Sequence, residues 1–364
     1  MLFLIFVFTM FCGIFFKKFK FYWLVCFLLL SLLVVTTKKY ADFSNYEYIF
    51  NYYNKGNISL IFSENGPILW NLLCYLIGKI GFSYRGMVLI VIFTSMWLIN
   101  YRIKDININN NIFWSLFILF PGIIQCVQLR FFLAISIIFF GLIPLLMEKK
   151  GSLIKYIICI IISYLVHSSC LIFIIFIFLP LFDKIGYKKT LAISVAFTLI
   201  LYFAFQKIIP QIASHLISTI KFNRYFNSNV TQTTTVRFIK IFFVWFLCNF
   251  TNILILKKLN NVLYNNDNLY VLVNNIQKAI SILVITTFFL VFDANFHRFI
   301  QIAYILFFIN ISLFYNYVSI SKIKKLSFLI IIIMILNFAY YIYTPYDTVT
   351  KPFFTFDGVY TILK

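Results

Sequence analysis

Apolar residues run through this chain in long, nearly uninterrupted stretches. The stretches recur from Met1 to Tyr343 and are separated by short segments that contain lysine, asparagine or proline. A bilayer core about 30 Å thick takes roughly 20 apolar residues as a helix, and no ten-residue segments alternate as in a membrane β-barrel. The pattern therefore predicts an all-α polytopic membrane protein with about 12 spans, over residues 2–16, 21–37, 86–101, 112–127, 131–147, 153–166, 169–182, 190–208, 238–256, 279–294, 299–318 and 326–343.

The orientation of these spans follows from lysine and arginine in the short loops, which favour the cytoplasm. This rule places the N-terminus and the segment 38–66 outside. Only one net crossing then fits between 38–66 and an inner loop at 102–110, although two apolar segments lie there. We therefore predict that 67–83, which contains Pro67, Asn71, Gly78 and Gly81, is re-entrant or interfacial. The cytoplasmic clusters are Lys17/Lys18/Lys20, Arg102/Lys104, Lys149/Lys150/Lys155, Lys184/Lys188/Lys189, Lys257/Lys258/Lys278 and Lys322/Lys324/Lys325.

One long apolar stretch, 153–182, has basic residues at both ends and is too long for one untilted span. We predict a hairpin of two short helices that turns at His167-Ser168-Ser169, near the outer face. No Gly/Ser linker or charge block divides the chain. It is therefore predicted to be a single integral membrane domain over 1–364, with outer loops at about 38–66 and 209–237.

Composition excludes several classes of protein. Hydrophobic residues make up 63% and charged residues 11% of the chain, whereas soluble domains carry about 25% charged residues. The net charge of +21 comes from lysines placed singly or in pairs between apolar runs, which is typical of orientation signals rather than of nucleic-acid binding. The seven cysteines form no CxxC pair, so neither a metal site nor a disulfide is expected. No Walker loop is present, and few acidic residues lie inside the spans, which disfavours ATPases and ion-coupled transporters.

The unusual polar residues gather at the predicted outer face, where an ionisable residue beside a span is costly and suggests a functional site. Arg130 stands at the mouth of a span, shortly after Pro121-Gly122, which is expected to break the preceding helix. It suits an anion clamp, because a guanidinium stays charged and grips phosphate bidentately; a snorkelling interface arginine is the alternative. His167 suits a proton acceptor or phosphate contact, or else a satisfied polar residue in a turn.

Two further segments carry candidate chemistry. In 209–237, Arg224, Tyr225 and Arg237 lie among aromatic, amide and hydroxyl residues that suit a sugar, although an interfacial aromatic belt would look similar. In 292–298, an acid, an amide, an imidazole and a guanidinium fall within six residues, as a binding cluster or a salt-bridged turn. These are Asp293, Asn295, His297 and Arg298.

Several of these motifs, taken in order over roughly residues 40–300, resemble the EpsG/Wzy family of bacterial polysaccharide (O-antigen repeat-unit) polymerases. The aromatic and acidic segment from Asp42 to Tyr48 comes first, and then Glu64-Asn-Gly-Pro67 resembles the family's Glu-x-Gly. Leu129-Arg130-Phe-Phe-Leu-Ala134 resembles its Arg-Gln-x-x-Ala, and Val166-His167-Ser168 its His-Ser step. Arg224-Tyr225 and Arg298 resemble its later arginines. The family's glutamine after the arginine is Phe131 here, and Gln128 is a candidate replacement.

The resemblance implies an all-helical, GT-C-like glycosyltransferase of the bacterial inner membrane, with its site facing the periplasm. Such a polymerase moves a growing glycan from undecaprenyl diphosphate to the next lipid-linked repeat unit, without nucleotide sugar, metal or other cofactor. Fixed arginines would stabilise the leaving diphosphate, and a base would deprotonate the acceptor hydroxyl. The implied partners are the lipid-linked oligosaccharides, the bilayer and a chain-length regulator, with no nucleic acid. A lipid-linked oligosaccharide flippase, an O-antigen ligase and a membrane acyltransferase are the alternatives.

The resemblance also implies roles for individual residues. Arg130 and Arg298 are assigned to the diphosphate, with Arg224 as a second clamp. His167 is the first candidate for the base, and Asp42, Glu64 and Asp293 are alternatives for the base or for orienting the acceptor. The remaining candidates for substrate binding are Tyr225, Arg237, His297, Asn295 and Gln128.

Overall fold

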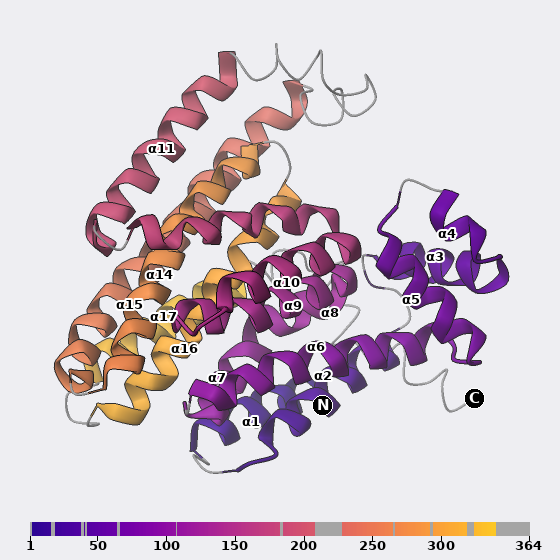
Figure 1. Cartoon of the computed structure of the whole chain (residues 1–364). Helices are drawn as coiled ribbons and strands as arrows, with labels where there is room; N and C mark the ends of the chain where they lie inside the picture. Colours follow the sequence, from indigo (N-terminus) through magenta and orange to yellow (C-terminus); the bar gives the residue numbers. More distant parts are fainter. Residues whose placement is uncertain are drawn as a thin grey trace. The chain divides into compact units, whose positions relative to one another are not determined.

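A computed structural model describes residues 2–15, 19–37, 40, 42–63, 66–106, 108–182, 185–207, 228–264, 266–291, 294–318 and 324–339. All regular secondary structure within these ranges is helical (Figure 1). The chain divides into two compact units, one of residues 1–174 with 334–364 and the other of residues 175–333. The expectation of a single integral membrane domain stays a prediction.

The first unit contains ten α-helices and a short π-helical segment among its described residues, and η2 begins in it. α9 packs along α6 and α10, while α3 packs on α5. The elements are α1 (Leu2–Phe15), α2 (Tyr22–Thr36), α3 (Phe43–Lys55), α4 (Ser59–Ser63), α5 (Ile68–Lys79), α6 (Tyr84–Ile106), α7 (Asn110–Phe117), η1 (Ile118–Gly122), α8 (Ile123–Val127), α9 (Leu129–Leu146), α10 (Ser152–Val166) and η2 (Ser168–Phe182).

The second unit is built around α14, which packs on α15, α16 and η3, while α11 packs on α15 (Figure 1). Its elements are α11 (Tyr187–Lys207), α14 (Ser228–Leu263), α15 (Asp267–Ile282), η3 (Leu283–Val291), η4 (Ala294–Ile300) and α16 (Gln301–Tyr317). α17 (Lys324–Phe338) begins in this unit and ends in the first one.

The chain is a multi-pass membrane protein. Seven helical stretches among the described residues are long and apolar enough to cross a bilayer: 84–106, 110–127, 129–146, 187–204, 241–263, 267–290 and 296–317. The other five predicted spans form shorter apolar helices, so the number 12 stays a prediction, as does the GT-C-like architecture.

Three features of the helices differ from the sequence-based expectation. The predicted outer loop 38–66 contains two helices, α3 and α4, and the last ten residues of the predicted loop 209–237 form the start of α14. Asn71 and Gly78 do not interrupt their segment, because both lie inside α5 and only Gly81, with φ +95°, follows its end. At 1.5 Å per residue, the 12 residues of α5 rise about 18 Å, which is less than the bilayer core.

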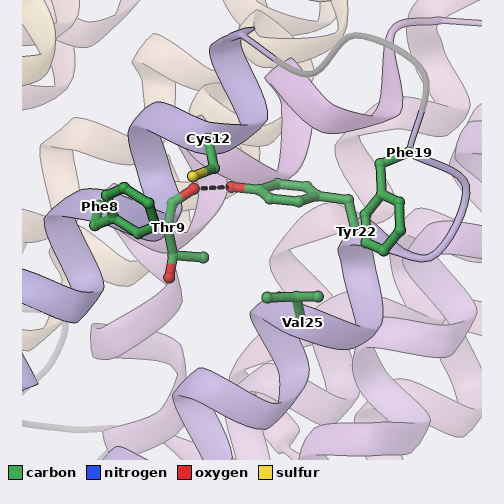
Figure 2. A pocket seen from close by; sticks show the side chains of 6 residues that line it. All are labelled: Phe8, Thr9, Cys12, Phe19, Tyr22 and Val25. Atoms are coloured by element: carbon green, nitrogen blue, oxygen red, sulfur yellow. Dashed lines mark hydrogen bonds between the residues drawn. The ribbon is translucent and has the colours of Figure 1, made fainter.

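The hairpin α1–α2 is tied to α7 by a buried tyrosine. Tyr22 donates to the carbonyl of Thr9 and lies 3.0 Å from the hydroxyl of Ser115. Gly13 is required beside them, because a Cβ there would overlap the side chains of Tyr22 and Ser115. A cavity of about 320 Å³ opens beside this bond and is lined mostly by apolar side chains of α1, of the start of α2 and of Phe19 before it (Figure 2).

Two arginines of the first unit complete backbone hydrogen bonding. Pro144 lies inside α9 and has no N–H, so the carbonyl four residues earlier, that of Phe140, loses its helical partner. Arg102 Nε donates to this carbonyl at 2.7 Å, and its guanidinium lies 3.8 Å from the Phe140 ring centre. Arg85 donates to the carbonyl of Val35 at 2.8 Å, where α2 ends and its last carbonyls have no helical partner.

The second unit contains a chain of buried amides that joins three helices. Asn310 Nδ2 of α16 donates to Asn252 at 3.0 Å, and Asn252 Nδ2 of α14 donates to Gln277 at 2.6 Å. Gln277 Nε2 of α15 in turn donates to Asn249 at 2.6 Å. Lys278, expected in a cytoplasmic loop, lies inside α15 instead and donates to Asn275 at 3.0 Å.

Candidate functional site

The span that leads to Arg130 is broken twice. Phe120 has φ −167° and ψ 130°, an extended conformation in the middle of the stretch 110–127, directly before Pro121-Gly122. This confirms the predicted break. Gln128, with φ −99° and ψ 55°, then separates α8 from α9. Irregular backbone inside a membrane protein is tolerated where it is buried in protein or lines a cavity. The second break places Gln128 and Arg130 at the N-terminal end of α9.

Arg130 lies in the first turn of α9 and is half-buried. No residue in the described ranges accepts a hydrogen bond from its buried Nε, and none of the carboxylates described comes within 4.0 Å of its guanidinium. The N-terminus of α9 adds a partial positive charge, and no side chain caps it. The arrangement therefore concentrates positive charge and open donors, which suits an anion.

Within the part of the chain that the structure describes, the Arg130 guanidinium lies against an aromatic ring. Its central carbon lies 5.5 Å from the ring centre of Tyr46, within the range of a cation–π interaction. Tyr46 belongs to α3 and packs against Trp70 of α5, with ring centres 5.8 Å apart. Trp70 is buried, and its indole N–H has no acceptor among the described residues.

His167 lies at the break between α10 and η2, with φ −151° and ψ 106°. This confirms the predicted turn. Tyr156 of α10 donates to the carbonyl of Phe173 at 2.7 Å, so the two arms are joined. The imidazole Nδ1 lies 2.8 Å from the hydroxyl of Ser169, and the ring meets Phe131 edge to face at 5.7 Å. Phe131 follows Arg130 directly, so the start of α9 contributes to both environments.

Gln128, Asp42 and Glu64 are the remaining candidate residues of the first unit. Gln128 is half-buried, and its buried Oε1 accepts no hydrogen bond from the described residues. Asp42 is exposed at the start of α3, and Tyr46 N donates to its backbone carbonyl at 3.0 Å. Burial raises the pKa of the neighbouring phenol of Tyr40 further above physiological pH. Glu64 lies outside the described residues.

The later candidates belong to the second unit. His297 and Arg298 lie in η4 and are half-buried, and both make interactions with other groups. Asn295 lies in η4 and Arg237 in α14, and their side chains are outside the described part of the chain. Arg224, Tyr225 and Asp293 are also outside it. Among the described residues, Arg130 and His167 are linked through Phe131, which follows Arg130 and contacts the imidazole. The contribution of the second unit stays a prediction.

Comparison with known proteins decides the family. The model of the EpsG family matches residues 20–356, which is most of the chain and includes every candidate residue. The chain belongs to the EpsG family. Membership indicates a membrane protein of the polysaccharide-polymerase type. No curated protein and no solved structure matches the chain.

Sequence reasoning on this EpsG-family chain did not select Tyr46 or Trp70 as site residues. Both are aromatic residues in aromatic-rich segments, and one-dimensional spacing does not show which ring lies against a cation. The available signal was indirect. Tyr46 lies in the aromatic and acidic segment that resembles the family, and Trp70 is the third residue after the Glu64-Asn-Gly-Pro67 motif.

Proposed function

We propose that this EpsG-family protein is a polysaccharide polymerase that acts on lipid-linked glycans at the outer face of the inner membrane. It transfers the growing glycan from undecaprenyl diphosphate to the next lipid-linked repeat unit. The observation that carries the proposal is Arg130, whose charge is not neutralised by any described carboxylate, at a broken span in a chain of this family.

The reaction exchanges one bond to the anomeric carbon for another. The bond between this carbon and the phosphate oxygen breaks, and the acceptor hydroxyl oxygen forms the new glycosidic bond. The hydroxyl proton passes to a base, and undecaprenyl diphosphate leaves with the bonding electrons. Arg130 stabilises the charge that develops on this leaving group, because a fixed cation interacts more strongly with the transition state than with the ground state. No step requires a metal ion in this proposal.

His167 is our candidate for the base. The 2.8 Å contact between Nδ1 and Ser169 fixes the imidazole orientation. When Nδ1–H donates to the Ser169 hydroxyl, the basic lone pair lies on Nε2, which is the tautomer that a base requires. Arg298 is proposed as a second diphosphate contact and Arg224 as a further clamp, with Asp42, Glu64 and Asp293 as alternatives for orienting the acceptor.

The test is a surface-polysaccharide gel of a strain that lacks this gene, complemented with wild type, Arg130→Ala or Lys55→Ala at equal membrane levels. Lys55 is an exposed cation at the end of α3 and serves as the matched control. We expect Arg130→Ala to leave only core plus one repeat unit, whereas Lys55→Ala restores the long ladder. A long ladder from Arg130→Ala at wild-type level would refute the assignment.

The deletion strain itself separates the alternatives. Loss of polymerisation alone leaves core plus one repeat, because repeat units are still exported and ligated. Loss of every glycan-bearing band would indicate a flippase or a ligase. An unchanged ladder would remove the protein from this pathway.

A further inference from the structure

Among the described residues, an aromatic face rather than a carboxylate lies against Arg130, the key cation of the site. The guanidinium carbon of Arg130 lies 5.5 Å from the ring centre of Tyr46. In the part of the chain that the structure describes, no acidic side chain forms an ion pair with it, and its Nε has no acceptor. This differs from Arg102, which donates to a carbonyl and pairs with Asp105 at 3.0 Å.

We propose that Tyr46 is a positioning residue for Arg130. Its ring fixes the guanidinium while leaving the positive charge and the N–H donors available to the departing lipid diphosphate. The inference rests on the proposed function, because it specifies how the diphosphate contact is prepared.

The chemistry of the two kinds of partner explains the choice. A carboxylate would cancel the charge of Arg130 and occupy its donors, so an incoming phosphate would have to displace it. A ring face attracts the cation through its quadrupole and forms no hydrogen bond with it. An exposed to partly desolvated cation–π contact of this kind corresponds to about a 2- to 30-fold effect on binding or rate.

The ring itself is held rigidly. The side chain of Tyr46 is 5% exposed and that of Trp70 1% exposed, and their planes are inclined by 57°. Trp70 lies in α5, which packs on α3. The buried pair therefore fixes the face over which Arg130 lies, and a partly buried guanidinium gains a defined orientation before substrate binds.

The test changes the electronics of the ring while nearly preserving its shape. Position 46 is replaced by phenylalanine and then by mono-, di- and trifluorophenylalanine, so that loss of the hydroxyl is common to the series. Each fluorine weakens the negative ring face. We expect the rate of glycan extension by purified protein in proteoliposomes, and its affinity for undecaprenyl diphosphate, to fall stepwise by about 2- to 30-fold in all. The thermal midpoint should stay within the range of the phenylalanine variant.

Phe50 provides the matched control, because it lies in the same helix, is 2% exposed and packs against Tyr84 rather than a cation. The same series at position 50 should give a flat response. A flat response at position 46 would overturn the inference, and so would equal slopes at the two positions. If Arg130→Ala loses affinity for undecaprenyl diphosphate while the position-46 series is flat, only the role of Tyr46 fails. If Arg130→Ala binds and extends glycan like wild type, the proposed function of the site fails as well.

Discussion

Arg102 and Pro144 are predicted to be energetically coupled, although they lie in different helices. Pro144 deprives the carbonyl of Phe140 of its helical donor, and Arg102 Nε supplies a replacement at 2.7 Å. Replacing Arg102 by methionine keeps the length of the side chain and removes its donors. The carbonyl of Phe140 is then left without the donor that replaces its helical partner.

The magnitude follows from the contacts that are lost. A hydrogen bond from a charged donor contributes about 1.5–3 kcal/mol. The contact with the Phe140 ring at 3.8 Å adds roughly 0.5–1 kcal/mol, and the partly exposed pair with Asp105 about 0.2–1 kcal/mol. We therefore expect Arg102→Met to destabilise the protein by about 2–5 kcal/mol. With Pro144→Ala present, the backbone N–H that alanine restores at this position can bond the Phe140 carbonyl, and the effect should shrink by about 1–2 kcal/mol.

The assay is a double-mutant cycle on unfolding in mixed micelles, followed by the fluorescence of the five tryptophans. Arg85→Met is the control, because Arg85 also donates to a backbone carbonyl but does so at the end of α2, far along the chain from Pro144. Its effect should be the same with and without Pro144→Ala. Equal effects of Arg102→Met in the two backgrounds would refute the coupling.

Two further predictions concern packing within each unit. Asn252→Leu removes the centre of the amide chain and leaves buried polar atoms of Gln277 and Asn310 without partners, so it should destabilise the protein by about 2 kcal/mol in the same unfolding assay. The control Asn260→Leu changes a part-buried amide pair at 3.4 Å and should alter stability by less than about 1 kcal/mol. Equal effects of the two substitutions would contradict the importance of the amide chain. Gly13→Ala places a Cβ against Tyr22 and Ser115 and should destabilise the protein by about 1–3 kcal/mol. In the control Gly86→Ala, the new Cβ meets only the side chain of Phe82 at 2.9 Å, so the effect on stability should be smaller. A thermal midpoint of Gly13→Ala at or above that of Gly86→Ala would argue against this packing.

The sequence could predict what local rules determine. Long apolar runs predicted helices, and a proline followed by glycine predicted the break before Arg130, because each depends on backbone chemistry near one position. The turn at His167 followed from the length of its apolar stretch. Each of these is present in the structure.

Features that depend on tertiary contacts were not predictable in this way. α3 is rich in polar and aromatic residues, so it lacks the apolar signal of a span and was expected to be part of a loop. Asn249, Asn252, Gln277 and Asn310 are uncharged and scattered over three apolar segments, and only packing reveals that they form one chain. Lys278 suggested a loop because a lysine inside a span costs free energy. Inside α15, a hydrogen bond from its ammonium group to Asn275 offsets part of this free energy.

The three arginines of the first unit show why burial of a charge is not sufficient to identify a functional residue. In the sequence, Arg85, Arg102 and Arg130 look alike, since each lies at or near the end of an apolar run. The structure separates them by what accepts their hydrogen bonds. Arg85 and Arg102 donate to carbonyls that helix termination or proline has left without partners, so their charge serves the fold. Arg130 has no such acceptor in the described ranges and lies against a ring that consumes none of its donors. A half-buried cation held in this way is stabilised further when an anion binds, and this property is the physical basis for the proposed contact between Arg130 and a leaving diphosphate.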